Sequence, residues 1–354
     1  MEQMLNIADS RSVTLLLHCD LRVGLAADLT RFVQTNGGRI VYHDHYVDNE
    51  INRYYTRLQW DLTNFTVAGG EIGDHLTTLA GGGDAQWSLG FSDRPQRMAV
   101  FVSKEPWCLY DILARSYSGE WPVEIPVIVA NHPDLKSVAD RFGIAFRVMP
   151  MTADNKAEIE EAQLALLAEH RIDLVVLAKY MQIVSERFVR AYENRIINIH
   201  HAFLPAFPGA RPYHSARARG VKIVGATAHY VTEVLDAGPI IEQDVMRVSH
   251  RDTVQELVRS GRDIEKIVLS RAIWNHLQNK IIVHHGRTIV FHRSASARRH
   301  QAIGEVSEIP AACITLYPAE QPLESHAESA PFGETGAALA GCRRFHRYQP
   351  SPAD

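Results

Sequence analysis

Apolar and polar positions divide the chain into a short first block and a longer second block. In the first block, β-branched and leucine-rich runs predict strands, and an apolar stripe with helical spacing predicts a helix after the first strand. The predicted elements are strands at 13–18, 39–46 and 54–62, a helix at 25–35, and a helix and a strand at 71–79 and 86–90. This order is typical of a ferredoxin-like α+β domain, which we assign to residues 11–92.

The second block, residues 97–291, alternates buried strands with amphipathic helices. Such alternation requires right-handed crossovers and predicts a Rossmann-like, mostly parallel α/β sheet. The predicted strands are 97–103, 125–130, 145–149, 173–178, 196–200, 225–231 and 239–245; the predicted helices are 108–116, 135–142, 156–170, 185–192 and 253–277, before a hairpin at 280–291.

Residues 292–354 are rich in Ala, Ser, Pro, Glu and Arg and have no sustained period. A segment of this kind buries too little apolar surface to offset its ordering entropy, so we predict a disordered tail. The 354-residue chain has a formal net charge of −4, which argues against a nucleic-acid partner. It has no apolar run approaching the roughly 18 residues of a membrane span and no signal peptide. Its four Cys are far apart, as in a cytoplasmic protein.

Two polar side chains emerge together at the end of the predicted strand 196–200. Asn198 and His200 are two residues apart, so they point to the same face of the strand. The carboxyl ends of strands are where open α/β sheets bind ligands. His201 points to the opposite face on this pattern, and we do not assign it to catalysis.

The turn 234–239 supplies a third polar group. Asp236 sits among apolar residues, where an unpaired carboxylate would be costly, so we expect it to pair with His200. That pairing would raise the pKa of His200, or Asp236 would take a proton from water directly. Asn198 would then donate to a developing oxyanion, His200 would polarise or protonate, and Asp236 would orient and activate the nucleophile. Spacing does not support a zinc site, and we expect no metal.

Long runs of the sequence resemble the formyltetrahydrofolate deformylases. Motifs similar to those of folate-dependent formyl-group enzymes are Asn198–His200, Leu204-Pro205, Phe207–Gly209 and Leu235–Pro239; motifs similar to the deformylases in particular are Ser103–Asp111, Pro126–Pro133, His200–His214 and Gly261–Lys266. The resemblance implies a formyltransferase-type catalytic domain that hydrolyses 10-formyltetrahydrofolate to formate and tetrahydrofolate, with Asn198, His200 and Asp236 as its catalytic trio. The folate would be substrate, with no further cofactor.

The loop at 103–107 separates a hydrolase from a transferase. Glycinamide ribonucleotide formyltransferases have a Gly-rich loop there, whose backbone N–H groups bind phosphate. Here the loop has no Gly, a proline without an N–H, and an acid that would repel phosphate. Water therefore remains as the acceptor. The alternatives are formyl transfer to an unknown amine, and an amino-acid-responsive regulatory protein with a vestigial folate site.

The resemblance also implies where the folate binds. The implied contacts are Tyr180 and Met181 on the pterin, backbone groups of Gln182 and Ile183, Lys179 at the anionic glutamyl tail, and His229, Val231 and Thr232 on the opposite wall. Met181 and Ile183 could instead fill the core, and Lys179 could be solvated. We assign Val184 to the core and Tyr213 to bracing the loop that follows the strand 196–200, which we call the central loop. Arg211 and His214 either line the formyl side of the pocket or brace that loop.

The first domain resembles the ACT domain, a module that binds free amino acids. The matching residues are Asp20 and Gly24 before the predicted helix and 36–38 after it. The resemblance implies an amino-acid effector, glycine or methionine, near Asp20 and Gly24. The alternative is that this domain mediates contacts between the subunits of a homo-oligomer, and both hypotheses stay open.

Overall fold

The computed structural model describes residues 11–81, 84–205 and 212–292. Within these ranges, two separate sheets correspond to the two blocks of the sequence, and a short hairpin follows them. The predicted tail at 292–354 lies outside the described residues except for its first position.

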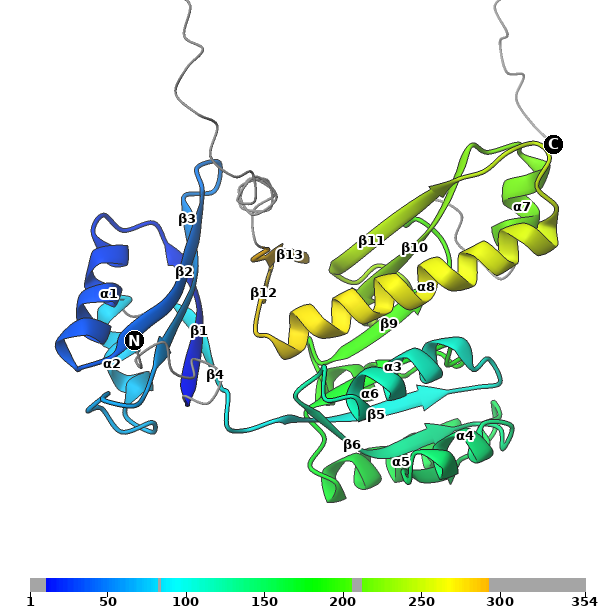
Figure 1. Cartoon of the computed structure of the whole chain (residues 1–354), viewed down its shortest axis with the longest axis horizontal. Helices are drawn as coiled ribbons and strands as arrows, with labels where there is room; N and C mark the ends of the chain where they lie inside the picture. Colours follow the sequence, from blue (N-terminus) through cyan, green and yellow to red (C-terminus); the bar gives the residue numbers. More distant parts are fainter. Residues whose placement is uncertain (1–10, 82–83, 206–211, 293–354) are drawn as a thin grey trace, which may run out of the picture. The chain divides into compact units, whose positions relative to one another are not determined.

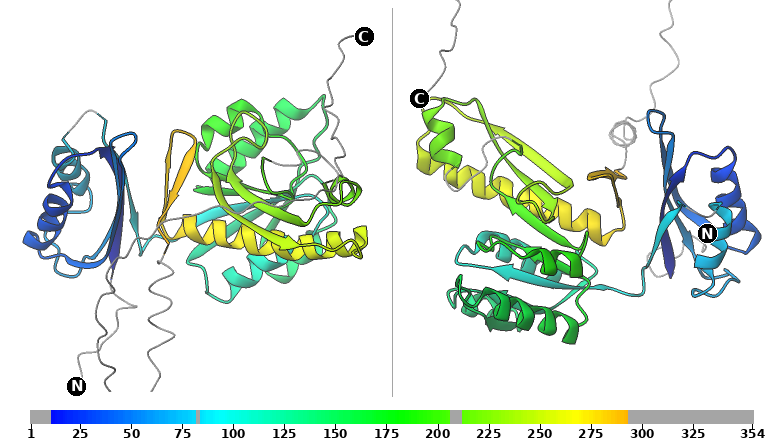
Figure 2. Two further views of the ribbon diagram at one scale, coloured as in Figure 1. Left: turned by 90° about the horizontal axis from the view of Figure 1, so that it is seen from above. Right: turned by 180° about the vertical axis from the view of Figure 1, so that it is seen from behind.

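The N-terminal sheet is antiparallel, with helices on one face. Its elements are β1 (Ser12–Asp20), α1 (Leu25–Thr35), β2 (Arg39–Asp48), β3 (Arg53–Asp61), α2 (Ile72–Leu79) and β4 (Gln86–Phe91). The strand order is β2-β3-β1-β4. Apolar residues of α1 and α2 share one buried cluster with β1, and Figure 2 shows both helices on the same side of the sheet. The ferredoxin-like prediction is confirmed.

The second sheet has seven strands in the order β11-β10-β9-β8-β5-β6-β7. Its elements are β5 (Gln96–Val102), α3 (Trp107–Tyr117), β6 (Val123–Ala130), α4 (Lys136–Arg141), β7 (Ala145–Val148), α5 (Lys156–Glu169), β8 (Leu174–Leu177), α6 (Glu186–Ala191), β9 (Ile196–His200), α7 (Pro212–Ala218), β10 (Ile223–Tyr230), β11 (Ile240–Arg247) and α8 (Val254–Leu277). The strands β5 to β9 are parallel to one another, and β10 and β11 are antiparallel additions. The mostly parallel α/β prediction is confirmed.

Helices cover both faces of this sheet. One buried cluster joins the strands to α3, α4 and α8, and a second cluster on the opposite face joins them to α5 and α6. Figure 1 shows α8 lying along β9, β10 and β11. The chain leaves β5 toward β6 and β7 on one side, then returns to β8 and β9 on the other. The order of the strands therefore reverses between β5 and β8.

One detail of the second block was not predicted. A short helix, α7, begins at Pro212. A proline suits the first turn of a helix because a backbone N–H at that position would have no acceptor within the helix. The closing hairpin, β12 (Ile281–His284) and β13 (Arg287–Val290), forms as predicted after α8.

The start of α8 gives a testable prediction for stability. The Thr253 hydroxyl accepts a hydrogen bond from the Glu256 backbone N–H at 3.2 Å, and the Glu256 carboxylate accepts one from the Thr253 N–H at 2.6 Å. Thr253→Ala removes this cap and should lower the free energy of unfolding by about 1 kcal/mol, measured by urea denaturation. Thr35→Ala is the matched control, because that hydroxyl bonds only to carbonyls of its own helix. An equal loss in both variants would contradict the capping role.

Candidate active site

The end of β9 carries the two side chains that the sequence analysis singled out. Because β10 runs antiparallel to β9, Thr227 lies opposite His200 and His229 lies opposite Asn198. His200 is buried and Asn198 is partly exposed. The same-face prediction is confirmed by their neighbours: Asn198 contacts His229 and His200 contacts Asp236, whereas the alternate residues Ile197 and Ile199 pack in a core cluster.

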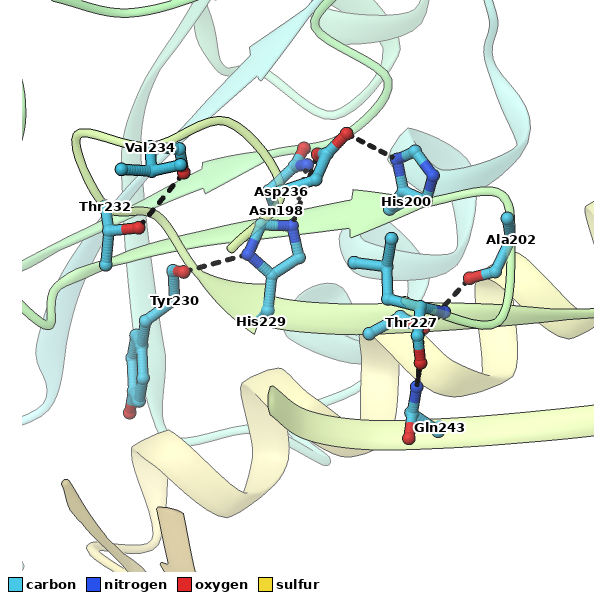
Figure 3. Close-up of polar contacts among 11 residues, drawn as sticks. Asn198, His200, Ala202, Thr227, His229, Tyr230, Thr232, Val234, Asp236 and Gln243 are labelled. Carbon is cyan, nitrogen blue, oxygen red and sulfur yellow. Dashed lines mark hydrogen bonds and ion pairs between the residues drawn. The ribbon is translucent and has the colours of Figure 1, made fainter. Parts of the chain in front are cut away.

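Asp236 reaches this face of the sheet from the loop between β10 and β11. Its Oδ2 lies 3.3 Å from Nδ1 of His200, as Figure 3 shows. Asp236 has a φ of 55°, in the left-handed region that few residues other than Gly, Asn and Asp adopt. At Gly238, a Cβ atom would lie 1.7 Å from the Tyr230 carbonyl oxygen. Only glycine therefore lets this loop fold back against β10 and deliver the carboxylate.

Burial favours the neutral form of His200. Desolvation is the largest effect and lowers its pKa; Asp236 raises it, and His229 and Lys179 lower it further. Asp236 raises the pKa of His200 as expected, but burial outweighs this effect and the net direction is downward. The neutral ring can donate from Nδ1 to Asp236. Its Nε2 is buried and has no hydrogen-bond partner among the described residues.

His229 fixes the orientation of Asn198. The Nδ1–H of His229 donates to the Tyr230 carbonyl at 2.8 Å, so its Nε2 is free to accept a hydrogen bond. The Asn198 Nδ2 lies 3.3 Å from this Nε2 and donates one of its two hydrogens there. Burial lowers the pKa of His229, which keeps the ring neutral in this role. The second hydrogen of Asn198 remains for a ligand.

One cavity joins these groups to the residues predicted to bind the folate. It measures about 630 Å³, within the usual range for small-molecule sites. The predicted contacts that line it are Lys179, Tyr180, Met181, Gln182, Ile183, His229, Val231 and Thr232, beside Asn198, His200 and Asp236. The structure thus brings together residues from two walls that lie some fifty positions apart in the sequence.

Comparison with known proteins identifies the family. The formyl transferase family model matches residues 96–273. A formyltetrahydrofolate deformylase from Synechocystis sp. is 52% identical over 280 residues, which cover 79% of this chain and 98% of the relative. The chain belongs to the formyltetrahydrofolate deformylase family.

Solved structures agree with this deformylase assignment. A crystal structure of a formyltetrahydrofolate deformylase from Pseudomonas syringae pv. tomato is 39% identical, with a TM-score of 0.79, and the match covers 82% of this chain and 97% of that one. A glycinamide ribonucleotide transformylase from Symbiobacterium toebii is 30% identical, with a TM-score of 0.54, over 58% of this chain and 98% of that one. The formyltransferase fold is therefore shared with both kinds of enzyme.

Polar contacts hold the 178–184 loop, which forms one wall of the cavity. The Ser103 hydroxyl donates to Asn131 at 2.7 Å and accepts from the Met181 N–H at 3.0 Å. At the other end of the loop, the Ser185 N–H donates to Glu160 at 2.8 Å. The hydrogen bond of the Met181 N–H is therefore made within the protein, to Ser103. The sequence analysis did not assign these supporting residues, although Ser103 and Asn131 lie in motifs that it quoted.

The side chains of the 178–184 loop differ in their solvent exposure. Met181 and Ile183 are each 61% exposed, so the alternative that they fill the core is wrong. Tyr180 is buried; its hydroxyl accepts from Gln163 at 3.1 Å, and its ring packs on Phe101. Val184 packs against the same core cluster, as predicted.

Lys179 is not a solvated side chain. It is 8% exposed, and its ammonium lies 3.3 Å from the carboxylate of Glu265. This buried pairing directs Lys179 inward, away from a solvent-exposed glutamyl tail. The role assigned to it from the sequence does not fit this geometry.

Three residues around the central loop can also be placed. His201 stacks on His200, with ring centroids 5.0 Å apart, and lines the cavity, so the expectation that it points to the opposite face was wrong. β9 ends at His200, and the alternation of side chains ends with it. Tyr213 is buried on α7, whereas His214 is exposed; Arg211 lies outside the described residues.

Thr227 anchors the start of the central loop. Its hydroxyl donates to the Ala202 carbonyl at 2.9 Å and accepts from the Leu204 N–H at 3.0 Å (Figure 3). Gln243 of β11 donates to both the Thr227 hydroxyl and the Leu204 carbonyl. The sequence analysis missed this pair because a Thr and a Gln in strands have no distinguishing local pattern.

The described ranges contain neither a cluster of metal ligands nor a membrane-spanning helix. No group of three or more His, Cys, Asp or Glu side chains there could hold a metal ion. No helix in the same ranges is both long and apolar enough to cross a bilayer.

The surroundings of His200 predict its titration. Its imidazole should titrate below the ordinary value of 6.5, because burial opposes the charged form. Asp236→Asn removes the charge that raises the pKa and should shift the midpoint further down. Lys179→Met removes a charge that lowers it and should shift the midpoint up.

Histidine NMR across a pH series measures these shifts, with the His200 signal assigned by its loss in His200→Gln. A midpoint at or above 6.5 in the unmodified protein would contradict the dominance of burial.

Proposed function

We infer that the chain hydrolyses 10-formyltetrahydrofolate to formate and tetrahydrofolate, and we propose that Asn198, His200 and Asp236 perform the reaction. The observation that carries the proposal is the approach of Asp236 to His200 beside Asn198, in a cavity large enough for a folate. The assembled trio argues against a regulatory protein with a vestigial site.

Asn198 and Asp236 act on opposite sides of the reacting carbon. The Asn198 hydrogen that His229 does not engage donates to the formyl oxygen, whose negative charge grows as water attacks. Asp236 Oδ2 faces His200, while Oδ1 lies 3.7 Å from His229, too far for a strong hydrogen bond. Oδ1 therefore retains the capacity to accept a hydrogen bond from the attacking water.

His200 and Asp236 carry the proton together. The pair takes a proton from water as the new C–O bond forms, and it returns that proton to the folate nitrogen as the C–N bond breaks. The pair ends the cycle in its starting state, and no external oxidant or reductant is required. A histidine that is neutral in the resting site is ready to accept this proton.

The folate would lie between the two walls of the cavity. Met181 and Ile183 offer exposed apolar side chains on one wall, and Val231 and Thr232 lie on the other. We propose that the pterin and the neighbouring aromatic ring of the substrate pack between them. Gln182 adds polar groups to this wall, and Tyr180 supports it from the core.

A formate assay tests the function. The protein incubated with 10-formyltetrahydrofolate and no acceptor should release formate above the uncatalysed rate. Asp236→Asn should abolish turnover while tetrahydrofolate binding, followed by calorimetry, persists. Asn198→Ala should lower kcat roughly 10²–10³-fold, the usual effect of losing one oxyanion donor.

Asp154→Asn is the matched control, because Asp154 is exposed and far along the chain from the trio. It should keep the unmodified rate. Full activity in Asp236→Asn would remove Asp236 from the mechanism, and no formate from the unmodified protein would refute the hydrolase.

For the N-terminal domain we propose regulation by an amino acid, with subunit contact in a homo-oligomer as the alternative. Gly24 begins α1 with a φ of 86°, and Asp20 pairs with Arg53 at 2.9 Å. If glycine or methionine binds there, it should raise the Tm in scanning calorimetry, and Asp20→Ala should remove the rise. No shift with either amino acid would favour the subunit-contact role.

A further inference from the structure

A buried carboxylate lies behind Lys179, which lines the catalytic cavity, and has no part in the mechanism above. Glu265 of α8 is 2% exposed. It accepts a hydrogen bond from the Trp107 indole N–H at 2.9 Å and from the Tyr213 hydroxyl at 3.4 Å, and Lys179 lies 3.3 Å away. These four residues, which we call the Glu265 cluster, join the start of α3, the 178–184 loop, α7 and α8.

Gly261 of α8 leaves the space that this cluster needs. At Gly261, one turn before Glu265, a Cβ atom would lie 2.0 Å from the Tyr213 hydroxyl oxygen, so glycine is required for Tyr213 to cross α8. The cluster also includes residues of two sequence motifs that the catalytic trio does not explain. Trp107 lies in 103–111, and Glu265 lies in 261–266.

The Glu265 cluster occupies the place where an open α/β sheet binds a ligand. Strand order reverses between β5 and β8, and ligands bind outside the carboxyl ends of the strands at such a point. Here Trp107 begins α3 directly after β5, and α3 lies beside α8 (Figure 1). The Trp107 ring has the Arg262 guanidinium 4.3 Å and the Lys179 ammonium 5.8 Å from its centroid. The crevice is filled by the protein's own side chains.

The strained backbone conformation of Lys179 indicates a functional role for its side chain. Its φ is 63°, a conformation that glycine adopts freely and that strains other residues. Such strain persists where the surroundings hold it in place, often at functional sites. Lys179 also lines the cavity that contains His200 and Asp236. It therefore stands between the reacting groups and the crevice at the start of α3.

We propose that the Glu265 cluster fills the acceptor subsite and thereby restricts the formyl acceptor to water. This inference rests on the proposed function, because it concerns which nucleophile reaches the same formyl carbon. With an amine in place of water, a new C–N bond would form, the bond to the folate nitrogen would break, and the amine's proton would pass to that nitrogen. The cluster prevents this reaction by its volume, and the trio itself would allow it.

The test measures partition of the formyl group between two acceptors. The full chain is incubated with 10-formyltetrahydrofolate and glycinamide, a small amine without a phosphate, and N-formylglycinamide and formate are quantified by mass spectrometry. The double variant Lys179→Gly/Glu265→Gln opens the crevice, suits the backbone at 179, and keeps an acceptor for Trp107 and Tyr213. The ratio of formylated amine to formate should rise by about tenfold or more, a discrimination that pocket shape can supply.

Two controls separate volume from other effects. Lys179→Met/Glu265→Gln removes the charges but keeps the side-chain volume, and should retain the unmodified ratio. Ile267→Ala shortens an exposed side chain of α8 outside the cluster and should also retain it. If the first double variant does not fold, Trp107→Ala opens the same crevice from α3 and should raise the ratio.

Three results would overturn the proposal. The first is an unchanged ratio of formylated amine to formate in a folded variant that hydrolyses the substrate and has the crevice open. The second is an equal rise of this ratio in Lys179→Met/Glu265→Gln. The third is loss of all hydrolysis in every cluster variant. The unmodified protein distinguishes the proposed hydrolase function from the proposed filling of the acceptor subsite. If it releases no formate, the hydrolase function is refuted, and the proposal about the subsite is not.

Discussion

The contact between His200 Nδ1 and Asp236 Oδ2, at 3.3 Å, is the interaction on which the rest of the site depends. The two residues are on different elements, so the contact exists only if the loop after β10 folds back onto the sheet. That fold requires glycine at 238, against the Tyr230 carbonyl, and the left-handed backbone of Asp236. Asn198 and His229 take their positions from the same pair of strands.

Two carboxylates on either side of the cavity wall differ in their partners: Asp236 lines the cavity and is partly exposed, and Glu265 is buried behind Lys179. Asp236 faces an imidazole, a group that exchanges protons readily near neutral pH, so this pair can do acid–base chemistry. Glu265 faces an ammonium, an indole N–H and a hydroxyl, so its lone pairs are committed to donors that hold elements together. A carboxylate shielded from water needs partners in either case. The chemistry of those partners determines whether it reacts or supports.

Much of this arrangement could be predicted from sequence. β-branched runs identified the strands, period-two spacing put Asn198 and His200 on one face, and the cost of burying Asp236 indicated its partner. The role of His229 could not be predicted, because it depends on which residue of β9 lies opposite it in the sheet. The direction of the His200 pKa shift depends on how deeply the ring is buried. The Glu265 cluster joins four positions with no common spacing.

The antiparallel run of β10 has a consequence for the motions available to the site. His200 lies where β9 ends, whereas the loop that carries Asp236 leaves the sheet near the start of β9, where the Val231 N–H donates to the Ile196 carbonyl at 2.9 Å. The imidazole and the loop that carries the carboxylate are thus attached at opposite ends of β9. A displacement of the 231–239 loop would therefore separate the two groups without any change in the register of β9.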